Sequence, residues 1–168
     1  MMQYLKNTLI STFVMICLFF FMGIGKIDKI KKTYIKDEVI VFVDMKVKRN
    51  VPLNKISNFT KRYQEFVDQT EINSLGWSYH KSGNKIVLIE RYKNEDANII
   101  TAKNISPNGI RYNLLKEAEN YFKIEKVSVF GAFTEKLIDF NLKTAEALDF
   151  DFDFEYYPII SGYSRNLN

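Results

Sequence analysis

The stretch "LGWSYHKSGNKIVLIERYKNEDA", Leu75 to Ala97, contains two strand patterns joined by a short polar turn. The first strand is expected over residues 76–81 and the second over residues 85–92. The glycine-containing connection at 82–84 is typical of a β-hairpin. After the second strand Asn94 is placed to cap a helix, and the two acids that follow lie where the positive end of a helix favours anions. The stretch therefore predicts a hairpin that leads directly into a helix.

Similar patterns continue on both sides of this stretch. Alternating apolar residues predict a strand before it, and further helical and strand patterns follow it. The expected elements are a strand at 38–48, a helix at 53–71, a helix at 108–122, a strand at 126–131 and a helix at 135–148. Paired strands separated by helices predict an α+β protein with the ferredoxin-like βαββαβ arrangement and extra helices. Such a sheet has helices on one face only, so we expect a second copy of the chain to cover its apolar other face.

The chain ends in a stretch where acids alternate with aromatic residues. The acids are Asp149, Asp151, Asp153 and Glu155. Calcium loops need ligands on a curved loop with a glycine at the sharp turn, and here Phe residues separate the acids. The alternation instead predicts an edge strand with acids toward water and rings inward.

The first quarter of the sequence differs from the rest. Residues 9–25 carry no charge, and Lys6 precedes them. The segment is short for a membrane span and long for the core of a signal peptide, so membrane anchor and cleaved signal both stay open. We therefore divide the chain into a hydrophobic segment at 1–25, a charged tether at 26–37 and a folded domain at 38–168, and expect the protein to be membrane-anchored or exported.

Composition excludes several functional classes. The 24 basic and 20 acidic residues give a formal net charge of +4, and both signs are spread along the chain, so no nucleic-acid surface is expected. Cys17 is the only cysteine and His80 the only histidine. With neither a Cys/His cluster nor a Gly-rich phosphate loop, the sequence predicts no metal site and no catalytic triad. An exposed position near the hairpin turn is expected for His80.

Aromatic and polar side chains gather on one face of the predicted hairpin. Trp77 and Tyr79 share one side of the first strand, and Glu90 and Tyr92 share one side of the second. Converging beneath helices, these groups would form an apolar pocket with a few orienting polar groups. The alternative is that Trp77 belongs to the core and that Glu90 and Arg91 form a surface or intersubunit ion pair.

At this point the pattern resembles the antibiotic biosynthesis monooxygenase (ABM) family, which includes quinol monooxygenase-like proteins. The resemblance covers about residues 39–165. Its landmarks are "VFVDMKVK", the hairpin stretch quoted above, "VFGAFTEKL" and the terminal "GYSR". The hairpin is the specific landmark, because family members commonly carry a Glu-Arg-Tyr run, a short polar turn and an acid-Ala pair there.

The resemblance implies a ferredoxin-like homodimer that forms an α+β barrel, with a pocket in each subunit. It also implies oxygenation of a quinol-like or polycyclic aromatic substrate without a cofactor. Trp77, Tyr79 and Tyr92 would then line the substrate site, Glu90 would orient the substrate or accept its proton, and Thr101 would hydrogen-bond it. Thr101 occupies the position where many family members have a histidine. This departure favours the alternative function, a non-catalytic ligand-binding or structural dimer.

Overall fold

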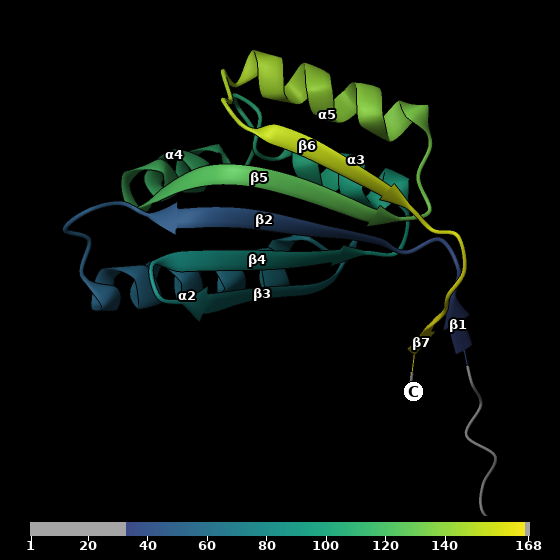
Figure 1. Cartoon of the computed structure of the whole chain (residues 1–168), viewed down its shortest axis with the longest axis horizontal. Coiled ribbons are helices and arrows are strands. Elements are labelled where there is room, and N and C mark those ends of the chain that lie inside the picture. The colour runs from purple at the N-terminus through teal and green to yellow at the C-terminus, as the bar shows by residue number, and fades with distance from the viewer. Residues whose placement is uncertain (1–32, 167–168) are drawn as a thin grey trace, which may run out of the picture. The chain divides into compact units, whose positions relative to one another are not determined.

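A mixed five-stranded sheet organises the part of the chain that the computed structural model describes, residues 33–166 (Figure 1). Its strands are β2 (Val39–Val47), β3 (Ser74–Ser82), β4 (Lys85–Tyr92), β5 (Phe122–Gly131) and β6 (Asp153–Pro158). Their order in space is β3-β4-β2-β5-β6, and only β5 and β6 are parallel. The first four strands have the ferredoxin-like order, which confirms the predicted α+β fold.

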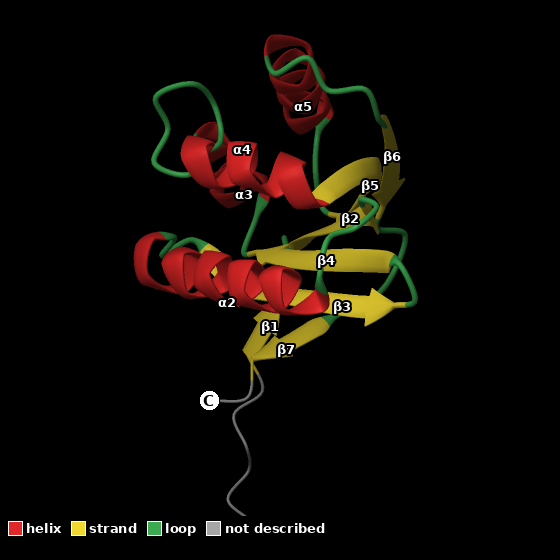
Figure 2. Cartoon of the chain, turned by 90° about the vertical axis from the view of Figure 1, so that its left-hand side faces the viewer, coloured by secondary structure: helices red, strands yellow, loops and turns green. Residues whose placement is uncertain are grey.

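Four helices of the described chain lie on one side of this sheet (Figure 2). They are α2 (Leu53–Thr70), α3 (Glu95–Lys103), α4 (Tyr112–Tyr121) and α5 (Glu135–Ala147). Helix α5 connects β5 to β6, as a parallel strand pair requires a crossover. This extra unit widens the sheet by one strand and adds a fourth helix above the same face.

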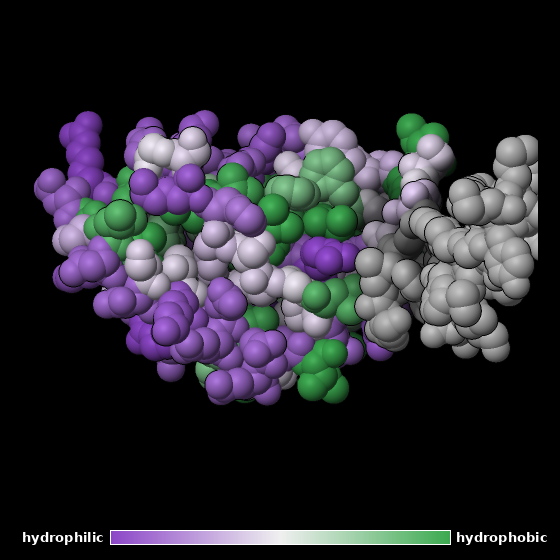
Figure 3. Space-filling view, turned by 90° about the horizontal axis from the view of Figure 1, so that it is seen from below, coloured by the Kyte–Doolittle hydropathy of each residue, from purple (hydrophilic) through white to green (hydrophobic). Residues whose placement is uncertain are grey.

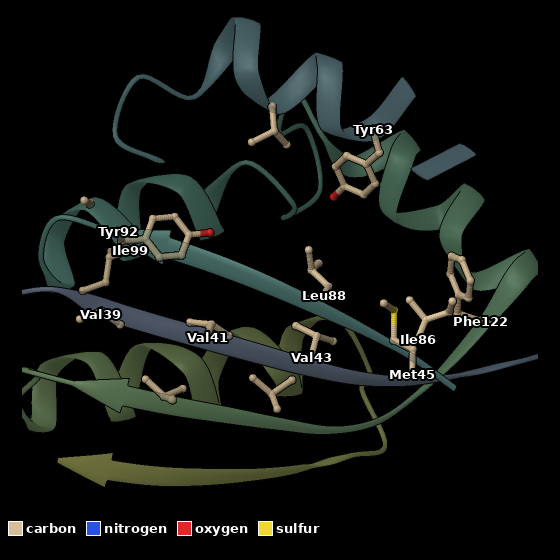
Figure 4. Packing of buried hydrophobic residues seen from close by; sticks show 14 of the residues in the cluster. Val39, Val41, Val43, Met45, Tyr63, Ile86, Leu88, Tyr92, Ile99 and Phe122 are labelled. Atoms are coloured by element: carbon tan, nitrogen blue, oxygen red, sulfur yellow. The ribbon is translucent and has the colours of Figure 1, made fainter. Parts of the chain in front are cut away.

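The core lies between the helices and the face of the sheet that they cover. Along β2, side chains alternate, so that Val39, Val41, Val43 and Met45 all point toward the helices (Figure 4). The apolar stripe of α2 meets them, with Ile56, Phe59, Tyr63 and Val67 buried. Burial of these complementary faces holds α2 against the sheet.

Both predicted helix caps are present. The Asn94 side-chain oxygen accepts a hydrogen bond from the Ala97 N–H at 2.9 Å, and the Thr134 hydroxyl oxygen accepts one from the Lys136 N–H at 3.3 Å. The Thr134 N–H also donates to the Glu95 carboxylate at 2.8 Å, which links the starts of α5 and α3. The abrupt passage from β4 into α3 therefore also positions α5.

Several boundaries differ from the prediction. Strand β5 begins at Phe122, directly after α4, four residues earlier than expected. Within the predicted tether, β1 (Thr33–Ile35) pairs with β7 (Ser164–Asn166) in a separate two-stranded sheet. The predicted hydrophobic segment, residues 1–25, and residues 26–32 lie outside the described residues. Between residues 33 and 166, no helix is both long enough and apolar enough to cross a membrane.

The sheet face opposite the helices carries apolar side chains that are only partly buried. They include Ile40, Phe42, Val87, Ile89 and Phe130. The Phe42 and Phe130 rings meet edge to face with centroids 5.3 Å apart, and Phe130 stacks on Tyr157 at 4.5 Å. In contrast, the view from the side of β3 and α2 shows mainly hydrophilic residues with separate hydrophobic patches (Figure 3). The face of the sheet opposite the helices thus presents apolar side chains that no helix of the described chain covers.

Candidate ligand pocket

A pocket of about 530 Å³ lies between the helix-covered face of the sheet and the four helices. All five strands and all four helices contribute residues to its wall. Its size falls in the range of small-molecule sites, and its lining is predominantly apolar and aromatic with a few polar groups. Such a composition fits a flat organic ligand.

Two rows of side chains run across the strands and form the floor of this pocket. One row contains Tyr79, Leu88, Val43, Val127 and Phe154, which are cross-strand neighbours on successive strands. The other contains Trp77, Glu90, Val41 and Val129 and continues to Tyr156 on β6. Aliphatic residues occupy the middle of both rows, and aromatic rings stand near the edges. The floor therefore spans the full width of the sheet.

Four of the five predicted site residues meet in this pocket. Trp77 lies directly opposite Glu90 in the strand register, and the Tyr92 hydroxyl donates a hydrogen bond to Glu90 Oε2 at 2.6 Å. The Trp77 and Tyr79 rings contact each other with centroids 6.4 Å apart. Glu90 does not pair with Arg91, because neighbouring residues of a strand point to opposite faces; Arg91 instead binds Glu38 at 2.6 Å.

Thr101, the fifth predicted residue, has a different place. It has no exposed surface and is absent from the pocket wall, to which α3 contributes Asn98 and Ala102. The backbone carbonyl of Thr101 accepts a hydrogen bond from the Arg111 guanidinium. Within the described residues, its own hydroxyl lacks a partner. Thr101 thus contributes to the site by holding Arg111, through the backbone rather than through its side chain.

Arg111 is the buried cation of the pocket, although it comes from the loop before α4. Its Nε lies 2.9 Å from Glu71 Oε1, and the exposed fraction is 3% for each side chain. The Asn104 amide donates to both Glu71 oxygens, at 2.9 and 3.0 Å. The Arg111 guanidinium carbon lies 5.3 Å from the centroid of the Trp77 ring and 6.0 Å from that of Tyr63. The cation is therefore held in place from several sides.

A close backbone approach sets the position of Arg111. The Arg111 N–H donates to the Asn104 carbonyl at 2.8 Å, which closes the loop between α3 and α4. A Cβ on Gly109 would lie 2.3 Å from that same carbonyl oxygen. Only glycine fits there without a shift of the loop.

Burial changes the acidity of the groups around the pocket. Desolvation raises the pKa of Glu90, and the Arg111 charge and the Tyr92 hydrogen bond oppose this only in part. Desolvation likewise raises the pKa of Tyr63 to about 12 and raises the pKa of Tyr79 and Tyr92. The Tyr63 and Tyr92 hydroxyls both point into the space above the sheet (Figure 4). The pocket thus presents neutral phenols beside one carboxyl group with a raised pKa.

Sequence reasoning missed Arg111 and Asn98. Arg111 stands between Ile110 and Tyr112 at the start of a helix, and its partner Glu71 lies 40 residues earlier, so no local pattern joins them. The one available signal is that this arginine stands between apolar residues at the start of a predicted helix, where a buried side chain is expected. Asn98 follows the capping residues of α3 and is 5% exposed, and its spacing of four residues from the apolar Ala102 would have placed both on the same side of the helix.

No group of His, Cys, Asp or Glu side chains in the described chain is arranged to hold a metal ion. His80 is exposed on the hairpin, where its Nε2 lies 3.0 Å from the Ser78 hydroxyl, as its position in the sequence predicts. The acid-aromatic stretch contains β6 at the edge of the sheet. There Glu155 pairs with Lys126 at 3.0 Å, while Phe154 lines the pocket, as expected for an edge strand. The strand begins only at Asp153, so the predicted strand is too long: Asp149 and Asp151 precede it, and both line the pocket.

The comparisons with known proteins support the fold. No model of a protein family matches the chain, and no curated protein matches it. The crystal structure of MupZ from Pseudomonas fluorescens is similar, with a TM-score of 0.60 and 14% identity, covering 77% of this chain and 96% of MupZ. The structural-genomics protein YjcS has a TM-score of 0.45 and 18% identity, covering 55% of this chain and 96% of its own. At this identity the likeness to MupZ shows a shared fold alone.

The buried ion pair gives a first testable prediction. Arg111→Met leaves the Glu71 carboxylate buried without its cation, so we expect the free energy of unfolding to fall by about 3–5 kcal/mol. The double variant Arg111→Met/Glu71→Gln removes both charges and should recover a substantial part of this loss. Urea denaturation of both variants measures the effect. Equal destabilisation in the single and double variants would contradict a coupled pair.

The raised pKa of Glu90 predicts a pH dependence of stability. Because the folded state favours protonated Glu90, stability should fall as pH rises from the ordinary carboxyl value of 4.5 toward the raised pKa. Glu90→Gln removes this titration. We therefore expect its stability to decline less than that of the parent chain over this window, measured by urea denaturation at a series of pH values. Parallel curves for the two proteins would show that Glu90 titrates normally.

Proposed function

We propose that the protein is an ABM-like, cofactor-independent monooxygenase that binds a quinol-like or polycyclic aromatic substrate in the pocket above the sheet. The observation that carries this proposal is the arrangement of Trp77, Glu90 and Tyr92 beside the buried Arg111. An aromatic wall, a carboxyl group with a raised pKa and a fixed cation meet in one largely apolar space. The resemblance of the hairpin stretch to the ABM family supplies the reaction type.

In the proposed reaction, the quinol first loses a proton. The Glu90 carboxylate accepts it from a substrate hydroxyl, and the nearby Arg111 cation stabilises the resulting ring anion. Molecular oxygen is the oxidant. One of its atoms forms a bond to a ring carbon and the other leaves as water, so that a quinol and O₂ become a hydroxyquinone and H₂O. Trp77 and Tyr79 orient the ring, and Tyr92 holds Glu90.

A second candidate function is non-catalytic binding of an aromatic ligand. Two observations favour it: no histidine lines the pocket of the described chain, and Glu90 Oε2 already accepts a hydrogen bond from Tyr92. A base held in this way is less available to a substrate. The fold and the pocket would then serve for binding alone.

The proposal includes a homodimer formed through the open face of the sheet. This face carries Ile40, Phe42, Val87, Ile89 and Phe130, and none of the four helices covers it (Figure 1). Apolar surface of this kind is stabilised by a second layer, and an identical sheet supplies one by twofold symmetry. Two such sheets would form the α+β barrel that the resemblance implies.

We also retain the proposal that the chain is tethered to a membrane or exported. It rests on the uncharged segment at residues 9–25 and on the basic residues that follow it. In that arrangement the charged tether connects the domain that contains the pocket to the membrane. Apolar quinols dissolved in the membrane would then be near the pocket.

Oxygen consumption tests the proposed reaction. With a panel of one-, two- and three-ring quinols, the full-length chain should consume oxygen faster than the uncatalysed reaction. Glu90→Gln should lower the rate about 10²-fold or more, because it removes the proton acceptor. Glu65→Gln, the same change on the exposed surface of α2, serves as the matched control.

Two outcomes separate the candidate functions. An unchanged rate in Glu90→Gln would remove Glu90 from the mechanism. Binding of the quinols without oxygen uptake above the uncatalysed rate would favour the binding protein over the enzyme.

Light scattering tests the dimer. The full-length chain should have the mass of two copies, and Phe42→Glu should shift it to one, because a carboxylate would enter the apolar interface. Ile72→Glu is the control, since Ile72 is 94% exposed and lies outside the sheet. A single-copy mass for the unaltered chain at all concentrations contradicts the proposal.

A further inference from the structure

The pocket has a second polar group, far from Glu90 along the floor. Asn141, on α5, lines the pocket and is only 8% exposed. It lies beside the hydroxyl of Tyr156 on the edge strand β6; burial raises the pKa of Tyr156, and the Asn141 amide opposes this. Among the described residues, the Tyr156 hydroxyl makes no hydrogen bond of full geometry. Asn141 thus forms a polar end of the pocket opposite Trp77 and Glu90, with Tyr156 as a neighbour that does not itself line the pocket.

The strand register gives the separation of the two ends. Glu90, Val41, Val129 and Tyr156 are successive cross-strand neighbours, so three interstrand spacings separate Glu90 from Tyr156. At ~4.8 Å for each spacing, this is about 14 Å. Only aliphatic side chains lie between the ends of this row. A single aromatic ring that contacts Glu90 therefore cannot also reach Asn141.

The Asn141 side-chain amide offers two donor hydrogens and an acceptor oxygen, and the neighbouring Tyr156 hydroxyl can occupy only part of this capacity, which leaves the amide able to bind a ligand atom. The Asn141 amide both donates and accepts hydrogen bonds, and it therefore suits a ligand hydroxyl or carbonyl oxygen. An anionic ligand group is disfavoured, because the Asp149 and Asp151 carboxylates line the same pocket beyond α5. We therefore expect a neutral hydroxyl or carbonyl oxygen, rather than a carboxylate, at Asn141.

From these observations we infer that Asn141 determines specificity by hydrogen-bonding an oxygen at the distal end of an elongated ligand. The ligand is a flat, fused-ring molecule of about three rings with an oxygen on each terminal ring, one at Glu90 and one at Asn141. This inference rests on the proposed function, because it takes an aromatic ligand in the pocket as given. Beyond the proposed function, it adds a second residue that hydrogen-bonds the ligand, and the distance between Glu90 and Asn141 then sets the length of the ligand.

The single tryptophan of the chain makes the inference measurable. Trp77 lines the pocket, so quenching of its fluorescence reports a bound aromatic ligand. The probes are two three-ring anthraquinones, one with a hydroxyl on both terminal rings and one with a hydroxyl on a single terminal ring. The full-length chain should bind the first about tenfold more tightly than the second, the effect of one buried hydrogen bond.

Variants at Asn141 identify the group responsible. Asn141→Leu keeps the size of the side chain and Asn141→Ala adds no bulk, and each should abolish the tenfold discrimination while the singly hydroxylated probe still binds. Thr144→Val changes another pocket residue of α5 and should keep the discrimination. Undiminished discrimination in both Asn141 variants overturns the inference.

Failure of the inference and failure of the proposed function give different results. Equal affinity of the unaltered chain for both probes overturns the role of Asn141 and leaves the aromatic pocket intact. Binding of neither probe by the unaltered chain overturns the aromatic-ligand pocket itself, and the inference with it.

Discussion

The ion pair between Arg111 and Glu71 is the interaction on which the pocket depends. Glu71 follows the end of α2, Thr101 and Asn104 belong to the end of α3, and Arg111 precedes α4. One buried guanidinium thus joins the ends of three helices, in addition to the more exposed Arg62–Glu117 ion pair between α2 and α4. A buried pair of this kind is weak evidence for stability, because desolvation offsets most of its attraction. Its effect is to fix where the helix ends lie relative to Trp77.

The two faces of the sheet have different surroundings: the helices cover one face, and none of them covers the other. Because side chains alternate along a strand, the same strands that place Val41 and Glu90 under the helices place Ile40 and Arg91 on the opposite face. A substitution at a residue of one face therefore leaves the side chains of the opposite face unchanged. Under the proposed function, the pocket face holds a ligand and the open face binds a second copy of the chain. Helix α5 and strand β6 extend the pocket face by one strand and increase the length of the floor in the same step.

The sequence predicts the fold and part of the pocket, for identifiable reasons. Trp77, Tyr79, Glu90 and Tyr92 could be placed together because period-two alternation and a short hairpin leave little freedom in register. Thr101 was harder, because counting residues along a helix gives its position but not its rotation against the sheet. Arg111 could not be placed, since its partners come from segments 10 and 40 residues away and only the tertiary structure brings these segments together.

Under the proposed function, charge balance explains how a pocket with no histidine among its described lining residues supports acid-base chemistry. Arg111 and Glu71 compensate each other at close range, and Asn104 occupies both oxygens of Glu71. Glu71 is therefore fully engaged as a structural anion. Among the described residues, the Tyr92 phenol donates a hydrogen bond to one oxygen of Glu90, and burial raises the pKa of Glu90. In its ionised form, a carboxyl group whose pKa is raised by burial is a stronger base than an ordinary carboxylate. Under the proposed function, desolvation of Glu90 thus replaces the imidazole that the Thr101 position lacks.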